Sequence, residues 1–136
     1  MKEVIRGVVA RSDLDQLDHL SMYEILRFYN DGVQQLSQSV YGRGGREEEG
    51  RKRFVAARAE LQFKKEMAEG DQWRLELGLR EIKAQFITLH GRILVGSSTV
   101  NRCSLVLVGL DLATRRSEAL SLEEEQCLRD ALEFGI

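Results

Sequence analysis

The chain has 136 residues, of which 43% are hydrophobic and 31% are charged, and its formal net charge is -2. This length is typical of a single domain with one hydrophobic core, so we expect residues 1–136 to form one domain. Basic and acidic residues are mixed along the chain without a basic stripe, so nucleic acid is not an expected partner. No apolar stretch approaches the roughly 18 residues of a membrane span, which favours a cytoplasmic protein that does not enter membranes.

The first predicted elements are a strand and a long helix. Residues 4–10, VIRGVVA, are apolar and β-branched on both alternating faces, which predicts a strand that is covered on both sides and therefore internal. Ser21 and Glu24 have the spacing of a capping box, so a helix is expected to begin directly after the acidic segment 11–20. From there apolar residues recur at steps of three and four, which predicts one buried helical face. That face consists of Met22, Ile25, Leu26, Tyr29, Val33 and Leu36.

A glycine-rich, highly charged segment at 41–53 has no apolar periodicity and predicts a surface loop. Alternating apolar and polar residues then predict strands at 55–65 and 73–81, and the short turn segment EGD between them favours a long hairpin. Two further strands are predicted at 86–95 and 100–112. The second of these is apolar on both faces from Leu105 to Val108 and should be central, whereas His90 in the first is expected to face solvent.

The chain ends in a second predicted helix. Ser121 and Glu124 form another capping box, and an apolar seam follows that consists of Leu122, Leu128, Ala131 and Leu132. A long apolar helix followed by a series of strands is an α+β pattern, in which the sheet buries its inner face by curling around the helix. The cysteines, Cys103 and Cys127, are far apart and are expected to be small buried hydrophobic residues, so neither a disulfide nor a metal site is predicted.

Several segments resemble the hotdog-fold acyl-CoA thioesterases of the 4-hydroxybenzoyl-CoA thioesterase type. The segment DLDQLDHLSMYEILRFYNDG carries the similarity through Asp13, Asp15, His19 and the LRFY run at 26–29. Residues 59–82 and 105–120 are similar to later strands of that family. Two departures stand out, because Asp18 occupies a position where glycine is usual and a Ser-Met pair at 21–22 replaces a common Asn-Asn pair.

The resemblance implies a hotdog fold, in which an antiparallel sheet wraps around one long central helix, with a short C-terminal helix. It implies hydrolysis of acyl-CoA or acyl-carrier-protein thioesters without a cofactor, in a homodimer that pairs into a homotetramer. By position, Asp15 inherits the role of nucleophile or general base, and His19 is a second catalytic candidate that orients substrate or water.

Physical chemistry adds binding candidates to this set. The free amides at a helix start stabilise a developing oxyanion, which points to the backbone N–H groups of Met22 and Tyr23. Because the resemblance implies that a CoA nucleotide binds at the surface, Arg51, Lys52 and Arg53 are candidates for contacts with its phosphates, and a solvated loop is the alternative.

Other functions fit these residues less well. A calcium loop would use Asp13, Asp15 and Glu24, but Asp18 stands where such a loop needs glycine. A dehydratase of the same fold would carry a His-Phe-Pro-Gly segment, and the chain contains no proline. A non-catalytic module that binds acyl thioesters or assists assembly stays open as the alternative to hydrolysis.

Overall fold

The computed structural model describes residues 1–42 and 52–136. The elements in chain order are β1 (Lys2–Val8), a short 3-10 turn η1 (Arg11–Asp13), α1 (Met22–Tyr41), β2 (Lys52–Phe63), β3 (Gln72–Lys83), β4 (Phe86–Val95), β5 (Ser98–Asp111), β6 (Arg116–Glu118) and α2 (Leu122–Phe134). Most of the loop predicted at 41–53 lies outside the described residues.

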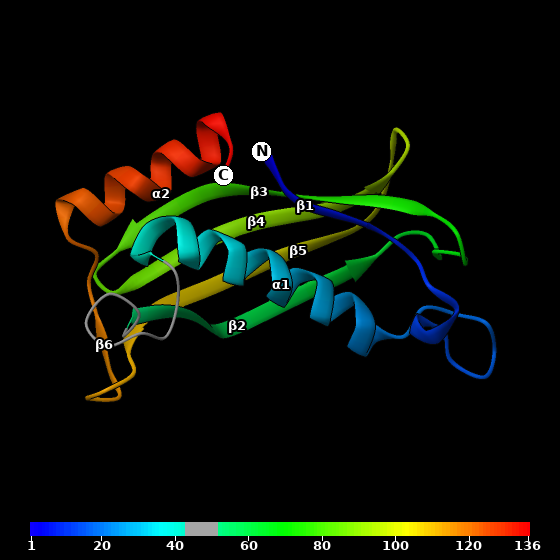
Figure 1. Ribbon diagram of the computed structural model, residues 1–136, viewed down its shortest axis with the longest axis horizontal. Helices are drawn as coiled ribbons and strands as arrows, with labels where there is room; N and C mark the ends of the chain where they lie inside the picture. Colours follow the sequence, from blue (N-terminus) through cyan, green and yellow to red (C-terminus); the bar gives the residue numbers. More distant parts are fainter. Residues whose placement is uncertain (43–51) are drawn as a thin grey trace.

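One antiparallel sheet carries the fold, with the strand order β1-β3-β4-β5-β2 and with β6 paired to β5. Figure 1 shows α1 lying across one face of this sheet, while α2 lies beside the end of α1 that leads to β2. The α+β architecture predicted from the sequence, a sheet wrapped around one long helix with a short C-terminal helix, is therefore confirmed.

The first strand is an edge strand, so the prediction that it is internal was wrong. Among the described strands, β1 pairs with β3 alone. Its apolar residues contact the core instead of a second neighbouring strand. Val4 and Ile5 pack against the hydrophobic core, and Val9, just past the strand, is fully buried. Apolar residues on both faces of a short strand therefore did not indicate two neighbouring strands.

The predicted hairpin between β2 and β3 was also wrong. β2 pairs with β5 at the opposite edge of the sheet, while β3 pairs with β1 and β4. The segment between them crosses the end of the sheet, because Lys64 donates its amide to the carbonyl of Val100 in β5 and Gly70 donates to the carbonyl of Val9 after β1. Met67 is buried in mid-crossing and anchors it. Period-2 alternation identifies a strand, but it does not choose its partner.

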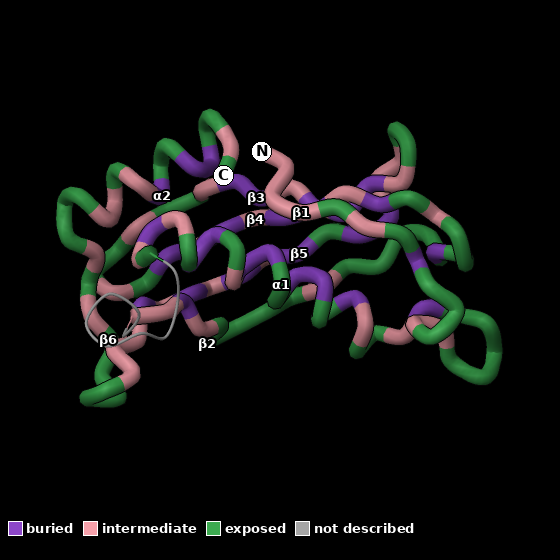
Figure 2. Tube along the Cα trace, viewed as in Figure 1, coloured by how far each residue is buried: buried purple, intermediate pink, exposed green. Residues whose placement is uncertain are grey.

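The helix α1 begins where the sequence predicted, with Ser21 as N-cap. Its buried face differs from the predicted one, because Phe28 is buried whereas Met22 and Leu26 are exposed. The buried face of α1 carries Ile25, Phe28 and Tyr29, whereas Leu26 lies on the uncovered side and Met22 is the exposed first residue of the helix. Figure 2 shows the buried residues of α1 and the sheet facing one another along the middle of the molecule.

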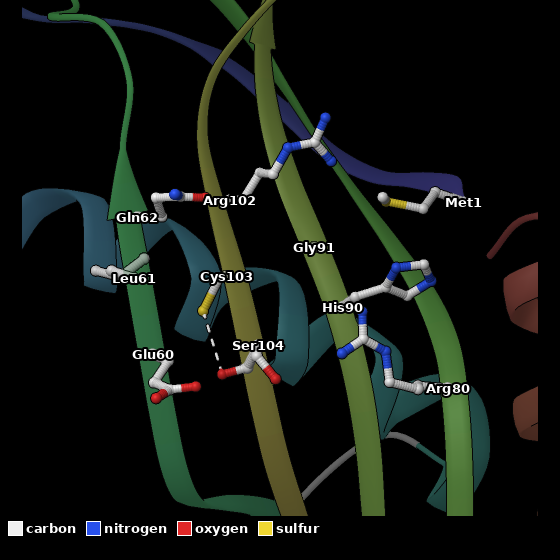
Figure 3. A pocket seen from close by; sticks show the side chains of 10 residues that line it. All are labelled: Met1, Glu60, Leu61, Gln62, Arg80, His90, Gly91, Arg102, Cys103 and Ser104. Carbon is white, nitrogen blue, oxygen red and sulfur yellow. Dashed lines mark hydrogen bonds between the residues drawn. The ribbon is translucent and has the colours of Figure 1, made fainter.

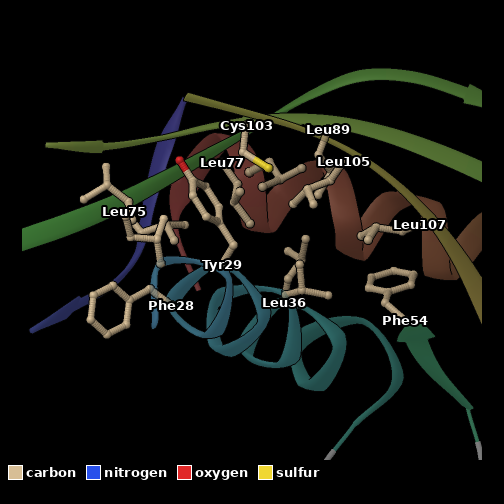
Figure 4. Close-up of a cluster of buried hydrophobic side chains, with 14 of the residues drawn as sticks. Phe28, Tyr29, Leu36, Phe54, Leu75, Leu77, Leu89, Cys103, Leu105 and Leu107 are labelled. Carbon is tan, nitrogen blue, oxygen red and sulfur yellow. The ribbon is translucent and has the colours of Figure 1, made fainter. Parts of the chain in front are cut away.

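The core lies between α1 and the sheet and is mostly aliphatic and aromatic (Figure 4). Two buried polar contacts cross it: the hydroxyl of Tyr29 donates to Oδ1 of Asn101 at 2.6 Å, and the amide of Phe54 donates to Oγ of Ser37 at 3.0 Å. Gly91 in β4 makes the first of these possible, because a Cβ there would lie 2.9 Å from the ring of Tyr29. Cys103 is buried in this core, as predicted.

The helix α2 has a complete capping box, since Ser121 Oγ accepts from the amide of Glu124 and the Glu124 carboxylate accepts from the amide of Ser121. Leu128, Ala131 and Leu132 are buried as predicted. Leu122 was wrongly assigned to the apolar seam, because it occupies the first turn and is 89% exposed. Among the described helices, none combines the length and apolar character needed to cross a membrane.

Candidate active site

Residues 14–20 form a closed loop directly before α1. Leu14 and Leu20 form an isolated antiparallel bridge, and the amide of Asp15 donates to the carbonyl of His19 at 2.8 Å. Leu20 is buried and fixes the base of the loop in the core. The acidic cluster is therefore a structured loop whose two ends lie side by side at the start of the helix.

The carboxylate of Asp15 is held inside this loop by backbone amides. Its Oδ1 atom accepts from the amide of Leu17 at 2.8 Å and from the amide of His19 at 3.1 Å. These hydrogen bonds, that of His19 first, lower the pKa of Asp15 below its ordinary value. Within the described part of the chain Oδ2 has no hydrogen-bond partner, and the side chain of Asp15 is exposed.

The backbone conformation at Asp18 explains why glycine suits this position. Its backbone φ is +59°, in the left-handed region that glycine adopts freely and that Asp and Asn tolerate better than other residues. The amide of Asp18 donates to the carbonyl of Asp15 at 3.0 Å, which closes the turn. Asp18 therefore keeps the loop conformation without being a glycine.

The start of α1 offers free amides next to this loop. Ser21 Oγ accepts from the amide of Glu24 at 3.3 Å, while the Glu24 carboxylate pairs with Arg27, so only half of the predicted capping box forms. The amides of Met22 and Tyr23 have no partner inside the helix, as for any helix start, and none is recorded for them elsewhere in the described residues. They lie at the positive end of the helix dipole.

Asp13 has a structural role. Its Oδ2 atom accepts from the amide of Ala10 at 2.9 Å, and its Oδ1 atom accepts from Nη2 of Arg27 at 3.2 Å. Arg27 also lies 2.7 Å from Glu24 and 3.5 Å from Asp31. This cluster ties the turn after β1 to the first turns of α1 and thereby fixes the direction in which the loop at 14–20 leaves.

His19 has a neighbour that the sequence did not suggest. Its Nε2 atom lies 3.6 Å from Oε1 of Glu66, which belongs to the crossing between β2 and β3. Both side chains are largely exposed, so the contact is weak. No local spacing relates two residues this far apart, and only the fold brings them together.

Three exposed apolar side chains lie on the Asp15 loop and on the first turn of α1. Leu17 is 69% exposed, Met22 59% and Tyr23 72%. Large apolar side chains clustered on one surface typically mark a binding or association surface. The candidate site therefore combines an ionised carboxylate, free helix-start amides and an uncovered apolar patch.

The predicted phosphate-binding residues do not join this site within one chain. Arg51 lies outside the described residues, and Lys52 and Arg53 begin β2, which follows the far end of α1. The 20 residues of α1 separate the two groups by about 30 Å along the helix axis. Lys52 is also engaged, because its Nζ lies 3.0 Å from Glu118 and 3.4 Å from Glu124, and these contacts raise its pKa.

The local geometry gives the calcium alternative no support. The carboxylates of Asp13 and Asp15 accept from amides of their own segment, and Glu24 is already helical. Among residues 1–42 and 52–136, no three His, Cys, Asp or Glu side chains converge in the way that a metal ion requires.

Comparison with known proteins finds similar structures but no similar sequences. No protein-family model matches the sequence, and no curated protein sequence matches it. Among solved structures, the hypothetical protein SAV2348 from Staphylococcus aureus, in complex with CoA, is similar with a TM-score of 0.80 and 14% identity over 97% of this chain and 85% of that one.

Two further structures are thioesterases by description. A thioesterase from Thermus thermophilus, complexed with coenzyme A and Zn, has a TM-score of 0.77 and 21% identity over 92% of this chain and 95% of that one. YbaW from Escherichia coli, a probable thioesterase, has a TM-score of 0.75 and 15% identity over 98% of this chain and 100% of that one. With its antiparallel sheet wrapped around α1, this chain has the hotdog fold that its sequence motifs suggested.

Proposed function

We propose that the protein hydrolyses acyl-CoA thioesters to a free acid and CoA thiol at the Asp15 loop. The observation that carries the proposal is the Asp15 carboxylate, which two loop amides keep ionised directly before the free amides of α1. Thioester hydrolysis needs a nucleophile or base on one side of the carbonyl and donors for the oxyanion on the other. The structural similarity to thioesterases and to CoA-bound proteins agrees with this chemistry.

Asp15 has two possible roles, as the nucleophile that attacks the thioester carbonyl or as the general base that deprotonates a water. We propose the nucleophilic route, for which the carboxylate must be ionised. In this route the Asp15 carboxylate forms an acyl-aspartyl anhydride and the thiolate leaves. Water then cleaves the anhydride, which releases the acid and restores the carboxylate.

We further propose that two copies of the chain complete the site and that these dimers pair into a tetramer. Leu17, Met22 and Tyr23 are exposed in the single chain, and an acyl group needs an apolar slot. A partner that covered this surface would form such a slot. Within it, we propose that His19 orients the acyl thioester or a water and that the amides of Met22 and Tyr23 bind the oxyanion.

The test is thiol release from a panel of acyl-CoA thioesters, with acyl-carrier-protein thioesters as a second arm. Asp15→Asn keeps the size and the acceptor for the loop amides but removes the negative charge, so we expect turnover to fall by about 10²–10⁴. Asp18→Asn, which tolerates the same backbone conformation, is the matched control and should lose far less. Equal rates in the two variants would contradict a catalytic Asp15.

The same assays distinguish the hydrolase from the non-catalytic alternative. Tight binding of acyl-CoA to the wild-type chain without any thiol release across both substrate arms would favour a binding or assembly module. Release of thiol from carrier-protein thioesters alone would keep the enzyme but change its substrate. Arg53→Gln tests the predicted phosphate contact, since a raised KM for acyl-CoA is expected if the partner's β2 start lies near the site.

A further inference from the structure

A cavity lies on the outer face of the sheet, opposite the face that α1 covers. It has a volume of about 380 Å³ and is lined by side chains from four neighbouring strands. Figure 3 shows Arg80 from β3, His90 from β4 and Arg102 from β5 around it, with Glu60 of β2 on the far side. His90 was predicted to face solvent, but in this cavity it is half-buried.

The cavity has an excess of uncompensated positive charge. Two other arginines of the sheet are paired: Arg92 with Glu76 at 2.8 Å and Arg58 with Glu60 at 3.3 Å. In the described residues, no carboxylate lies within ion-pair distance of Arg80 or Arg102. Glu60, the carboxylate that lines the cavity, is already engaged by Arg58. Two guanidinium groups therefore face the cavity without a partner.

The position of His90 depends on a glycine in the neighbouring strand. Gly78 pairs with His90 across β3 and β4, and its missing side chain leaves room for the imidazole, because a Cβ there would lie 2.9 Å from Cδ2 of His90 and closer still to Nε2. The imidazole therefore lies over the backbone of β3, beside Arg80 in Figure 3. Three nitrogen-bearing side chains thus border one concave surface.

We propose that this cavity binds a small molecule through a phosphate or pyrophosphate group held by Arg80 and Arg102. A guanidinium fork matches two phosphate oxygens, so two unpaired arginines bordering one cavity provide a bidentate contact each. The cavity volume lies at the small end of the range typical of ligand sites, which suits a phosphate ester or a nucleotide. The site lies across the sheet from α1 and does not depend on the proposed hydrolase function.

Proton uptake provides an independent signature of binding. The pKa of His90 is lowered, first by burial and then by the positive charges of Arg80, the amino group of Met1, Arg102 and Arg92. An anion among these groups compensates their charge and raises the pKa of His90. Binding therefore takes up a proton in the pH range where His90 titrates, so affinity should increase as the pH falls through that range.

The experiment follows the imidazole signal of His90 by NMR during titration with pyrophosphate, ADP and CoA at constant ionic strength, with sodium chloride as reference. We expect saturable shifts at His90 and a raised pKa of that residue. A saturable shift with pyrophosphate alone would indicate that the ligand is a free phosphate or pyrophosphate. Tighter binding of ADP or CoA would indicate a nucleotide ester. No saturable shift with any of the three would overturn the proposal.

Matched variants separate a built site from general attraction to positive charge. The double variant R80Q/R102Q should weaken binding at least about tenfold. R6Q/R74Q removes the same charge from two arginines of the same sheet that do not line this cavity and should bind as the wild type does. Equal weakening in both double variants would contradict the proposal. Should R80Q/R102Q fail to fold, the His90 titration of the wild-type chain decides the outcome.

Discussion

The carboxylate of Asp15 shows how a short loop sets the chemistry of one side chain. It is exposed, yet amide hydrogen bonds from His19 and Leu17 lower its pKa. A lowered pKa in the folded state adds stability at pH values above the unfolded pKa, and this contribution is lost as the pH falls through the folded pKa. Exposure to solvent keeps the contribution small.

The same shift predicts the pH dependence of activity. Because the pKa of Asp15 lies below its ordinary value of 3.8, we expect the acid limb of kcat/KM that belongs to Asp15 to lie below that pH. The measurement is a pH–rate profile for thiol release, together with the carboxyl carbon shift of Asp15 by NMR. An Asp15 carboxyl that titrates above its ordinary range would contradict the loop hydrogen bonds and favour a general-base role instead.

The Tyr29–Asn101 pair makes a prediction about stability. Both residues are fully buried, and the Nδ2 atom of Asn101 has no partner within the described residues. Tyr29→Phe leaves the side-chain Oδ1 atom of Asn101 without its hydrogen bond, which should lower the free energy of unfolding by about 1–3 kcal/mol. Replacing both residues, as in Tyr29→Phe with Asn101→Leu, should cost less than the two single changes added together.

Urea denaturation of the wild type, both single variants and the double variant measures this coupling. The double-mutant cycle gives the interaction energy of the two side chains directly. Additive losses would mean that the hydroxyl and the amide contribute independently, contrary to the 2.6 Å hydrogen bond between them.

At the scale of elements, the cap of α2 is a local feature with a measurable cost. Ser121 and Glu124 satisfy each other's amides at the start of the helix. Ser121→Ala should therefore reduce stability by about 1 kcal/mol. Ser117→Ala, an exposed serine on the short strand β6, is the control and should leave the denaturation midpoint unchanged. Equal midpoints for both variants would show that the cap contributes nothing.

Helix starts were predictable because their signals are local. Ser21 and Ser121 are N-caps in the structure, as their spacing to Glu24 and Glu124 indicated. Strand positions were also predictable from alternation. Strand partners were not predictable, because pairing depends on contacts between distant segments. The hydrogen bond from Lys64 to Val100, at the start of the crossing between β2 and β3, is one such contact.

In the candidate site, too, the local features were predictable from the sequence and the contacts between distant segments were not. Asp15, Leu17 and His19 form a local turn of the kind that Asp favours, so the loop and its free helix amides follow from one short segment. The proximity of Glu66 to His19 and the separation of Lys52 from Asp15 depend on the whole fold. Sequence spacing alone could indicate neither.

At the scale of the whole molecule, two exposed surfaces support the proposed dimer. The strand β2 is an edge strand whose middle carries exposed alanines, and Phe63 at its end is 49% exposed. Met22 and Leu26 on the open turn of α1 are also exposed. Open edges of this kind pair readily with other strands, and symmetric pairing with a second copy is the commonest closed solution.

The dimer proposed above therefore predicts the effect of one charge on β2. Ala59 lies in the exposed middle of this edge. Ala59→Lys places like charges close together when two copies pair along β2, which should shift sedimentation from dimer or tetramer to monomer and reduce thiol release together with it. Ala113→Lys adds the same charge in the exposed turn between β5 and β6 and should change neither quantity. A wild-type chain that is folded, monomeric and fully active at micromolar concentration would contradict both the dimer and a site shared between copies.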